Sequence, residues 1–433
     1  MNTGPDVRTT AKVASLLDKA ARVDGEEQKE DDGFEGEDSE AGERSEEDGP
    51  SSIVVETNPE IDTDVRTPQD KPPLTRKQRR NQVNRGKWRV KRDSQRSATG
   101  TGIKSCAKAK VQQTIHSPDN VDTSFIPPPR AWTGPRRPPT TVSDRLNRVL
   151  KMPGMRLIEW RDKRQTRLIR DGNGRRLAVL AGWPSDDFGE LITRVHAKCQ
   201  KIESLMKKPA SQRFNRRGPH AALPTGVSFG GGQEEPTELR NDTKNAELLR
   251  EFLEDPDVQR VARYHDYIFR VYFPELHALY RKVLDKIVDD NPNLHPNFDR
   301  CCFAAATLNM GRVFTRRHLD HLNLYCGLCS VSPTGTFDYT KGGHLVLWDL
   351  KLIIEVPPGC TVLFPSALIE HSNIPIGRNE ERSSFVQYSA SGLFRWVNNG
   401  CMSNKSFKER ASEKQLQAWE EHKEALIREG LKL

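Results

Sequence analysis

The chain has 433 residues, with 68 lysines and arginines against 60 acidic residues, and 35% of its residues are hydrophobic. No run approaches the roughly 18 to 20 apolar residues that span a bilayer, and the start, MNTGPDVRTT, lacks the basic and apolar segments of a secretory signal. We therefore expect neither a membrane protein nor a secreted one. The eight cysteines are too few and too scattered for a disulfide framework, so we expect a protein of a reducing compartment.

Residues 1–142 are predicted to be a disordered tail and linker. The segment 24–48 is strongly acidic, 71–96 is strongly basic, and the chain is rich in Ser, Thr and Pro from 97 to about 142. Few aromatic residues precede residue 145, namely Phe34, Trp88, Phe125 and Trp132. The basic block is interpreted as a nuclear localisation signal, a phosphate-binding arm or a solvated tail, and we favour a nuclear protein.

Ordered structure is predicted from residue 143, where a β-hairpin and helix extension spans 143–209. A short helix is followed by the β-rich runs MRLIEW, TRLIR and RRLAVLAGW, and the Asp-Gly-Asn-Gly spacer between the last two predicts a hairpin. Ser185 and the acidic residues after it have the composition of a helix start.

Residues 213–236 are basic and then glycine-rich without periodicity, which predicts a long loop. The three glycines at 230–232 are no phosphate-binding loop, because no Gly-Lys-Ser/Thr follows. Helical patterns cover 242–254, 257–271 and 274–289, and their apolar stripe predicts packing against a core.

After Pro296 the pattern changes to short apolar runs separated by Gly and Pro turns. Five or more such strands predict an antiparallel sandwich or barrel, followed by a polar helix at 405–430. The fold class is therefore predicted as α+β, with the main domain at 210–402 and a C-terminal helix within 403–433.

Three residues of this β region form a possible metal site. His318 and Asp320 stand two residues apart, and the side chains at such positions of a strand point to the same face. His371 follows several strands later, where a closed sheet could bring it opposite the pair. Two histidines and one carboxylate are the ligands of non-haem Fe(II) oxygenases. Arg382 on the next strand has the donors to bind the remote carboxylate of 2-oxoglutarate.

The wording of this region resembles a known enzyme family. The segments HLDHLNL, TKGGHLVLWDLKLIIEVPPGCTVLFPSALIEHSNIPI and RSSFVQYSASGLFRWV resemble the TET/JBP oxygenases, and most closely the branch that expanded in mushroom-forming fungi alongside transposable elements. The resemblance covers about 210–400. It implies a double-stranded β-helix, or jelly-roll, core and oxidation of the methyl group of 5-methylcytosine or thymine in DNA.

Carried over to this chain, the resemblance implies that His318, Asp320 and His371 hold Fe(II) and that Arg382 binds 2-oxoglutarate. Asn323 matches a position that hydrogen-bonds the cytosine edge in some members. Several members have a base-contacting histidine where this chain has Ala390, and His321 stands one place before a histidine of some relatives.

The partner implied is a methylated DNA duplex, from which the base is flipped into the pocket. Substrate contacts are expected from Gly231 and Gln233 of the glycine-rich loop, which has a counterpart in that branch. The arginines expected to contact phosphates, unless they form a merely solvated basic face, are Arg213, Arg216, Arg217, Arg316 and Arg317.

Two other patterns are interpreted as structural. Cys326 and Cys329 have zinc or redox spacing, but no second pair follows, so we expect buried thiols. His344 is expected to be a structural residue of a strand. The predicted function is oxidation of 5-methylcytosine in DNA, and two alternatives stay open: an oxygenase acting on thymine, RNA or protein, and a non-catalytic, transposon-derived DNA-binding protein. We also expect residues 1–140 to be dispensable for the chemistry.

Overall fold

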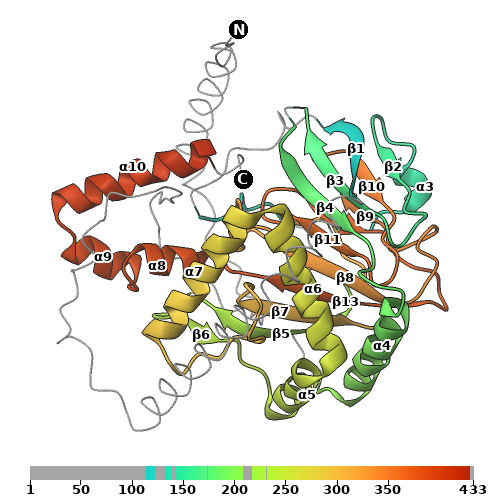
Figure 1. The fold of residues 1–433 in the computed structure, drawn as a ribbon, viewed down its shortest axis with the longest axis horizontal. Coiled ribbons are helices and arrows are strands. Elements are labelled where there is room, and N and C mark those ends of the chain that lie inside the picture. The colour runs from blue at the N-terminus through green and yellow to red at the C-terminus, as the bar shows by residue number, and fades with distance from the viewer. Residues whose placement is uncertain are drawn as a thin grey trace. The chain divides into compact units, whose positions relative to one another are not determined.

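The computed structural model describes residues 114–121, 132–138, 140, 143–172, 174–207, 217–230 and 232–429. Its secondary structure combines helices with two β-sheets, which confirms the mixed helix-and-sheet prediction (Figure 1). The acidic and basic blocks of the tail lie outside the described residues, so their predicted disorder stays a prediction. None of the helices described is long and apolar enough to cross a membrane.

A nine-stranded sheet forms the centre of the fold, in the order β1-β3-β4-β11-β8-β13-β7-β5-β6. All its neighbouring strands pair antiparallel except β1 and β3. The strands are β1 Thr114–Val121, β3 Thr166–Asp171, β4 Arg176–Ala181, β5 Ala221–Ser228, β6 Thr237–Glu238, β7 Ala305–Met310, β8 Cys329–Thr336, β11 Thr361–Phe364 and β13 Glu381–Tyr388.

A second sheet has four short strands in the order β12-β9-β10-β2. The strands are β2 Arg156–Ile158, β9 Leu345–Leu347, β10 Leu352–Ile354 and β12 His371–Asn373. The rings of Phe364 on β11 and His371 on β12 lie 5.0 Å apart, so the two sheets contact each other across a shared interior. The sequence pattern of short strands with Gly and Pro turns therefore predicted the mainly antiparallel sheets of this region.

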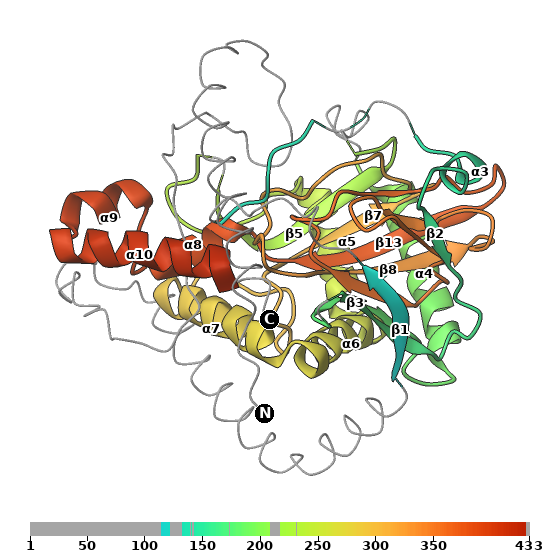
Figure 2. The same ribbon diagram turned by 90° about the horizontal axis from the view of Figure 1, so that it is seen from above.

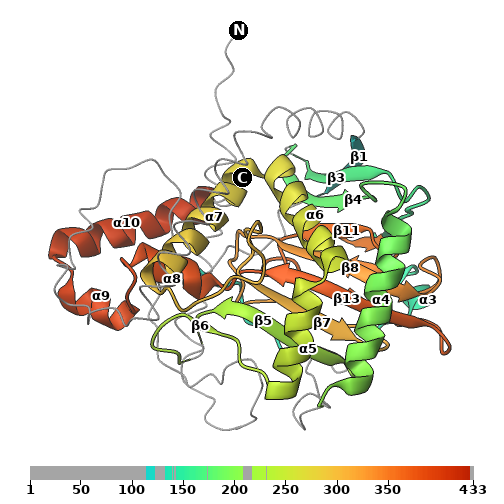
Figure 3. The same ribbon diagram turned by 60° about the horizontal axis from the view of Figure 1, so that its bottom comes forward.

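Helices cover the other face of the large sheet (Figures 1 and 3). They are α4 Phe188–Leu205, α5 Thr243–Glu254, α6 Pro256–Tyr272 and α7 Pro274–Asp290. Strand alternation then assigns the two faces of β13. Phe385 faces the helices, since its ring stacks on His265 of α6 at 5.7 Å. Arg382 and Ser384, which have the opposite parity, point to the interior between the sheets.

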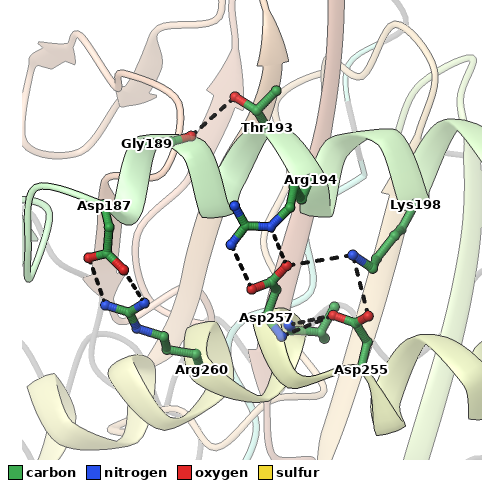
Figure 4. A network of polar contacts seen from close by, with 9 residues as sticks. Asp187, Gly189, Thr193, Arg194, Lys198, Asp255, Asp257 and Arg260 are labelled. Carbon is green, nitrogen blue, oxygen red and sulfur yellow. Dashed lines mark hydrogen bonds and ion pairs between the residues drawn. The ribbon is translucent and has the colours of Figure 1, made fainter.

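Ion pairs join two of these helices, as Figure 4 shows. Asp257 near the start of α6 accepts hydrogen bonds from Arg194 of α4 at 2.8 and 3.0 Å. Asp187, just before α4, accepts a hydrogen bond of 2.9 Å from Arg260 of α6. These contacts are solvent-exposed. They hold α4 and α6 together on the side of the large sheet that faces away from the small sheet.

The hairpin β3–β4 and the helix α4 lie within the range 143–209, where a hairpin and a helix were predicted. β2 pairs instead with β10 of the small sheet. A short helix, α3 Leu146–Val149, lies before β2 and beside the small sheet, as seen in Figure 2. The extension is thus built into both sheets of the main domain rather than appended to it.

Two predictions about elements were wrong. The long loop predicted at 213–236 contains β5, which pairs along β7 from Ala221 to Gly226. Pro224 obscured this strand, yet β6 pairs only with Val227 and Ser228 of β5, so Pro224 lies on a free edge where no amide donor is needed.

The single C-terminal helix predicted at 405–430 is two helices, α9 Asn404–Arg410 and α10 Glu413–Glu429, which follow α8 Ser391–Asn398. The helix is interrupted at Ala411 and Ser412. The Ser412 hydroxyl accepts a hydrogen bond from the backbone amide of Gln415, which caps the start of α10. A polar sequence with helical propensity on both sides gives no sign of this break except the serine itself.

Candidate metal and anion site

The three predicted metal ligands converge in the structure. His318 Nε2 lies 3.6 Å from Asp320 Oδ1, and His371 Nε2 lies 3.7 Å from Asp320 Oδ2. All three ligand atoms lie within 4.8 Å of one another. His318 is on an extended segment rather than a regular strand, but it forms a bridge with His371 through two backbone hydrogen bonds of 3.0 Å. This bridge sets the two imidazoles side by side.

The backbone also orients both imidazoles. His318 Nδ1 lies 2.7 Å from the carbonyl oxygen of Arg316, and His371 Nδ1 lies 2.9 Å from that of Ile369. A carbonyl only accepts, so Nδ1 carries the proton in each ring and Nε2 presents its lone pair toward Asp320. Burial holds the pKa of both histidines below the ordinary value, which keeps them neutral and able to ligate.

Asp320 is charged in this environment. Burial acts to raise its pKa, but the pKa lies below the usual range because the guanidinium of Arg217 favours the charged carboxylate. Arg217 Nη2 lies 2.9 Å from Asp320 Oδ1. The site therefore offers two neutral nitrogens and one carboxylate on one side, which is the donor set that Fe(II) accepts while keeping open positions.

Arg382 is a buried cation on β13 that contacts the segment leading to His318. Its side chain is 2% exposed, Nη1 donates to the carbonyl of Val313 at 3.1 Å, and Nε has no hydrogen-bond partner. None of the acidic side chains that the structure describes pairs with it, and burial lowers the pKa of Arg382 to about 10. A buried, uncompensated guanidinium is costly unless an anion joins it, so this position fits a carboxylate ligand.

Two buried histidines accompany the arginines. The pKa of His220 is lowered to about 4 by burial and then by the charges of Arg217 and Arg382, and its Nδ1 has no partner. His344 is 0% exposed, neither of its ring nitrogens has a partner, and burial lowers its pKa to about 4. The preceding Gly343 packs against the Arg382 side chain, where a Cβ would lie 3.3 Å from Cδ. Unpaired nitrogens beside a buried guanidinium suit an anionic ligand.

Asn323 and Ala390 lie opposite each other. They form an antiparallel bridge at the ends of their segments, and Asn323 Nδ2 donates to Ser366 Oγ at 3.2 Å. The backbone amide of Asn323 donates to the carbonyl of Asp320 at 2.9 Å, so this side chain is fixed close to the triad. The two positions singled out for reading a base thus form one edge of the site.

The glycine-rich loop begins next to this edge. A Cβ on Gly392 would overlap the carbonyl oxygen of Phe229, so the loop and the start of α8 touch backbone to backbone. The side chain of Gln233 is used within the loop, accepting from the amide of Gly230 and donating to Thr237. Gly231 lies outside the described residues, and its contact with substrate stays a prediction.

The predicted phosphate-binding arginines divide into different roles. Arg217 contacts the ligand Asp320, and Arg317 stacks 3.2 Å above the Trp348 ring and pairs with Asp144. Arg316 has described contacts through its backbone: its amide donates to the carbonyl of Arg217, and its carbonyl oxygen lies 2.7 Å from His318 Nδ1. The positions of Arg213 and Arg216 are outside the described residues.

A second group of metal-competent side chains has a structural role. Asp266, His277 and Cys302 come together where α6 and α7 meet the start of β7. Asp266 Oδ1 accepts from His277 Nε2 at 2.8 Å and from the backbone amide of Cys302 at 2.9 Å. These donors already satisfy the carboxylate, and burial holds the thiol's pKa well above its usual value, so the group has the features of a hydrogen-bonded core cluster.

Cys326 and Cys329 are buried free thiols, as predicted. Burial raises the pKa of both, to about 12 for Cys326. Neither belongs to a group of possible metal ligands among the described residues.

Comparisons with known proteins are distant. No protein-family model matches the sequence, and no curated protein matches it. Among solved structures, NgTET1 in complex with 5mC DNA is 16% identical, with a TM-score of 0.41 over 56% of this chain and 84% of that one. A 2OG-Fe(II) oxygenase family oxidoreductase from Burkholderia pseudomallei is 16% identical, with a TM-score of 0.27 over 46% and 77% of the two chains.

A Pseudomonas putida prolyl-4-hydroxylase is 15% identical, with a TM-score of 0.25 over 46% of this chain and 86% of that one. Similarity this weak leaves the activity of the present chain to be inferred from its own side chains.

The sequence did not indicate every residue of the site. His344 was predicted to be a structural residue of a strand; it directly precedes β9, and nothing in the sequence indicated that both of its ring nitrogens would lack partners. His220 and the contact of Arg217 with Asp320 gave no signal, because the partners are far apart in the chain.

Proposed function

We propose that this chain is an Fe(II)- and 2-oxoglutarate-dependent dioxygenase that oxidises the methyl group of 5-methylcytosine in DNA. The observation that carries the proposal is the pairing of the triad His318, Asp320 and His371 with Arg382, a buried arginine that has no acidic partner among the described residues. A divalent metal would account for the triad, and a dicarboxylate that also ligates the metal would account for the charge of Arg382, which no described acidic side chain balances.

The chain's own residues have defined tasks in this proposal. The two histidines and Asp320 hold the metal on one side, which leaves the positions opposite for oxygen and for the keto acid. Arg382 binds the remote carboxylate. His220, whose pKa is lowered by the charge of Arg382, and His344, which follows the glycine packed against Arg382, are neutral candidates to donate or accept near it. When bound, the metal would couple the consumption of dioxygen and the decarboxylation of 2-oxoglutarate, which gives succinate and CO2, to hydroxylation of the substrate methyl group.

The assignment to DNA rests on the rim of the site and on the resemblance of the sequence. Asn323 offers a carboxamide next to the metal ligands, suited to the edge of a flipped cytosine. Arg145, Arg148 and Lys151 are exposed on and beside α3, whose neighbour Asp144 contacts the site segment through Arg317. Basic residues there would hold phosphates, and a DNA substrate favours the nucleus as the site of action.

The decisive experiment incubates the full chain with a methylated duplex, Fe(II), ascorbate and 2-oxoglutarate, followed by mass spectrometry of the nucleosides. We expect loss of 5-methylcytosine, gain of 5-hydroxymethylcytosine and succinate formed with it. Oxidised thymine instead would change the base. Succinate formed only with RNA or protein added would change the substrate class, and no metal binding and no succinate would leave a non-catalytic DNA-binding protein.

A further inference from the structure

The segment 132–138 with Thr140, here called the strap, crosses the metal site. The sequence assigned it to the linker that ends at 142, yet its backbone is hydrogen-bonded to the segment that carries His318 and Asp320. The carbonyl of Trp132 accepts from the amide of Tyr325 at 3.1 Å, and the amide of Thr140 donates to the carbonyl of Arg317 at 3.2 Å. These bonds lie on either side of the two ligands.

The middle of the strap, at Thr133 and Gly134, packs directly against the segments that carry the metal ligands. The amide of Gly134 donates to the carbonyl of His321 at 2.8 Å, directly after the ligand Asp320, and Thr133 forms a bridge with Leu324. A Cβ on Gly134 would overlap the carbonyl oxygen of Ala367, in the loop that leads to His371. Gly134 is therefore enclosed between the two segments that supply the metal ligands, and only glycine fits there.

A side chain of the strap reaches the third ligand's segment as well. Arg137 Nη1 lies 3.5 Å from Asp349 Oδ1, and Asp349 Oδ2 accepts from the amide of Glu370 at 2.6 Å. Glu370 immediately precedes His371. The strap is thus connected to both ligand-bearing segments, by backbone contact at Gly134 and through Asp349 at Arg137, while it supplies no ligand itself.

We infer that the strap positions the metal ligands, with Gly134 as its principal positioning residue. The inference rests on the proposed function, because it takes the triad to be a metal site. Metal ligands work only when their own supports hold them in place, and loss of such a support typically lowers metal affinity 10- to 100-fold. This departs from the expectation that residues 1–140 are dispensable: the chemistry would require residues 132–140, and a chain shortened to residue 143 would keep all four site residues without this support.

The test measures Co(II) binding and the Co(II) absorption spectrum in the full chain, because Co(II) reports coordination geometry without turnover. Gly134→Ala forces the strap away from Ala367. We expect the Co(II) dissociation constant to rise by about tenfold or more and the visible bands to change. Gly172→Ala is the matched control, because a Cβ there meets nothing within 4 Å, and it should bind Co(II) like the parent.

Thr140→Pro is a second variant that removes one backbone donor at an exposed position already preceded by prolines. It should weaken Co(II) binding less than Gly134→Ala does, and it decides the question if Gly134→Ala fails to fold. Parent-like affinity and spectrum in the folded Gly134→Ala protein, or in Thr140→Pro when that is the variant that folds, would overturn the strap's role. If the parent itself bound no Co(II), the proposed function would fall, and the strap's role with it.

Discussion

Asp320 is the residue on which the metal site depends most, because it contributes the only charge among the three ligands. Asp320→Ala should abolish Co(II) binding, lowering affinity at least about 100-fold, since two neutral imidazoles rarely retain a metal in an open site. Isothermal titration with Co(II) measures this, and Asp338→Ala, which changes a turn carboxylate paired with Lys341, is the control. Retention of full affinity by Asp320→Ala would remove the metal assignment.

Arg382 should determine the requirement for 2-oxoglutarate. A buried, charge-assisted contact contributes roughly 1.5 to 3 kcal/mol, so Arg382→Ala should raise the apparent KM for 2-oxoglutarate by about 10- to 150-fold, with Co(II) affinity nearly unchanged. Arg312 forms a backbone β-bridge with Arg382, but its side chain lies on the surface and donates to the carbonyl of Gly377 at 2.7 Å. Arg312→Ala should therefore keep the parent KM, and equal effects of the two changes would contradict the assignment.

Asn323 should decide which base is oxidised. Its bridge partner Ala390 has no polar side chain, so on this edge the carboxamide alone can distinguish the cytosine edge from that of thymine. Asn323→Ala should cost about 1 to 3 kcal/mol in transition-state stabilisation on 5-methylcytosine and leave metal binding intact. Steady-state rates on paired duplexes with one 5-methylcytosine or one thymine measure it, and equal rates in the parent protein would mean that another residue reads the base.

Elements with strong local patterns were predictable from the sequence, and those defined by distant partners were not. The helices α5, α6 and α7 follow from apolar spacing, and the β3–β4 hairpin follows from the Asp-Gly-Asn-Gly turn. β5 was missed because a strand with Pro224 exists only through its pairing with β7. The triad was predictable because a short spacing and a family resemblance marked it, whereas the strap is defined by hydrogen bonds to segments far along the chain.

The α4–α6 pair offers a prediction about helix packing. Asp257 receives a bidentate guanidinium from Arg194, which holds the pKa of that carboxyl low, and Asp257→Asn should lower the free energy of unfolding by about 0.5 to 1 kcal/mol. The loss should shrink in high salt. Glu254→Gln is the control, because the Arg250–Glu254 pair is mostly exposed. Urea unfolding at two salt concentrations measures the free energy of unfolding of both variants. If Asp257→Asn were as neutral as Glu254→Gln, Asp257 would have no role in joining the helices.

At the scale of the whole molecule, the buried histidines make stability depend on pH. Burial lowers the pKa of His265 to about 3 and that of His220 and His344 to about 4, against about 6.5 in the unfolded chain. Between pH 6.5 and 4 the unfolded state therefore binds more protons than the folded state. Linkage then requires that the metal-free protein lose stability as pH falls through this range and regain it as pH rises.

Each such histidine contributes at most roughly 1.4 kcal/mol per pH unit, so the fall in stability should be steep below pH 6. His265 is the residue to change, because it lies under the helices, 0% exposed, with its Nε2 2.7 Å from Ser332 Oγ and away from the metal ligands. His265→Gln should lower the slope of unfolding free energy against pH by up to about 1.4 kcal/mol per pH unit, which corresponds to one proton, although the variant is less stable at pH 7. Gly172→Ala, which removes no titratable group and whose new Cβ would meet nothing within 4 Å, should leave the slope unchanged. Urea unfolding of the three proteins at pH 7, 6, 5.5 and 5 measures the slopes, and a parent slope of zero would mean that these imidazoles are protonated in the folded chain.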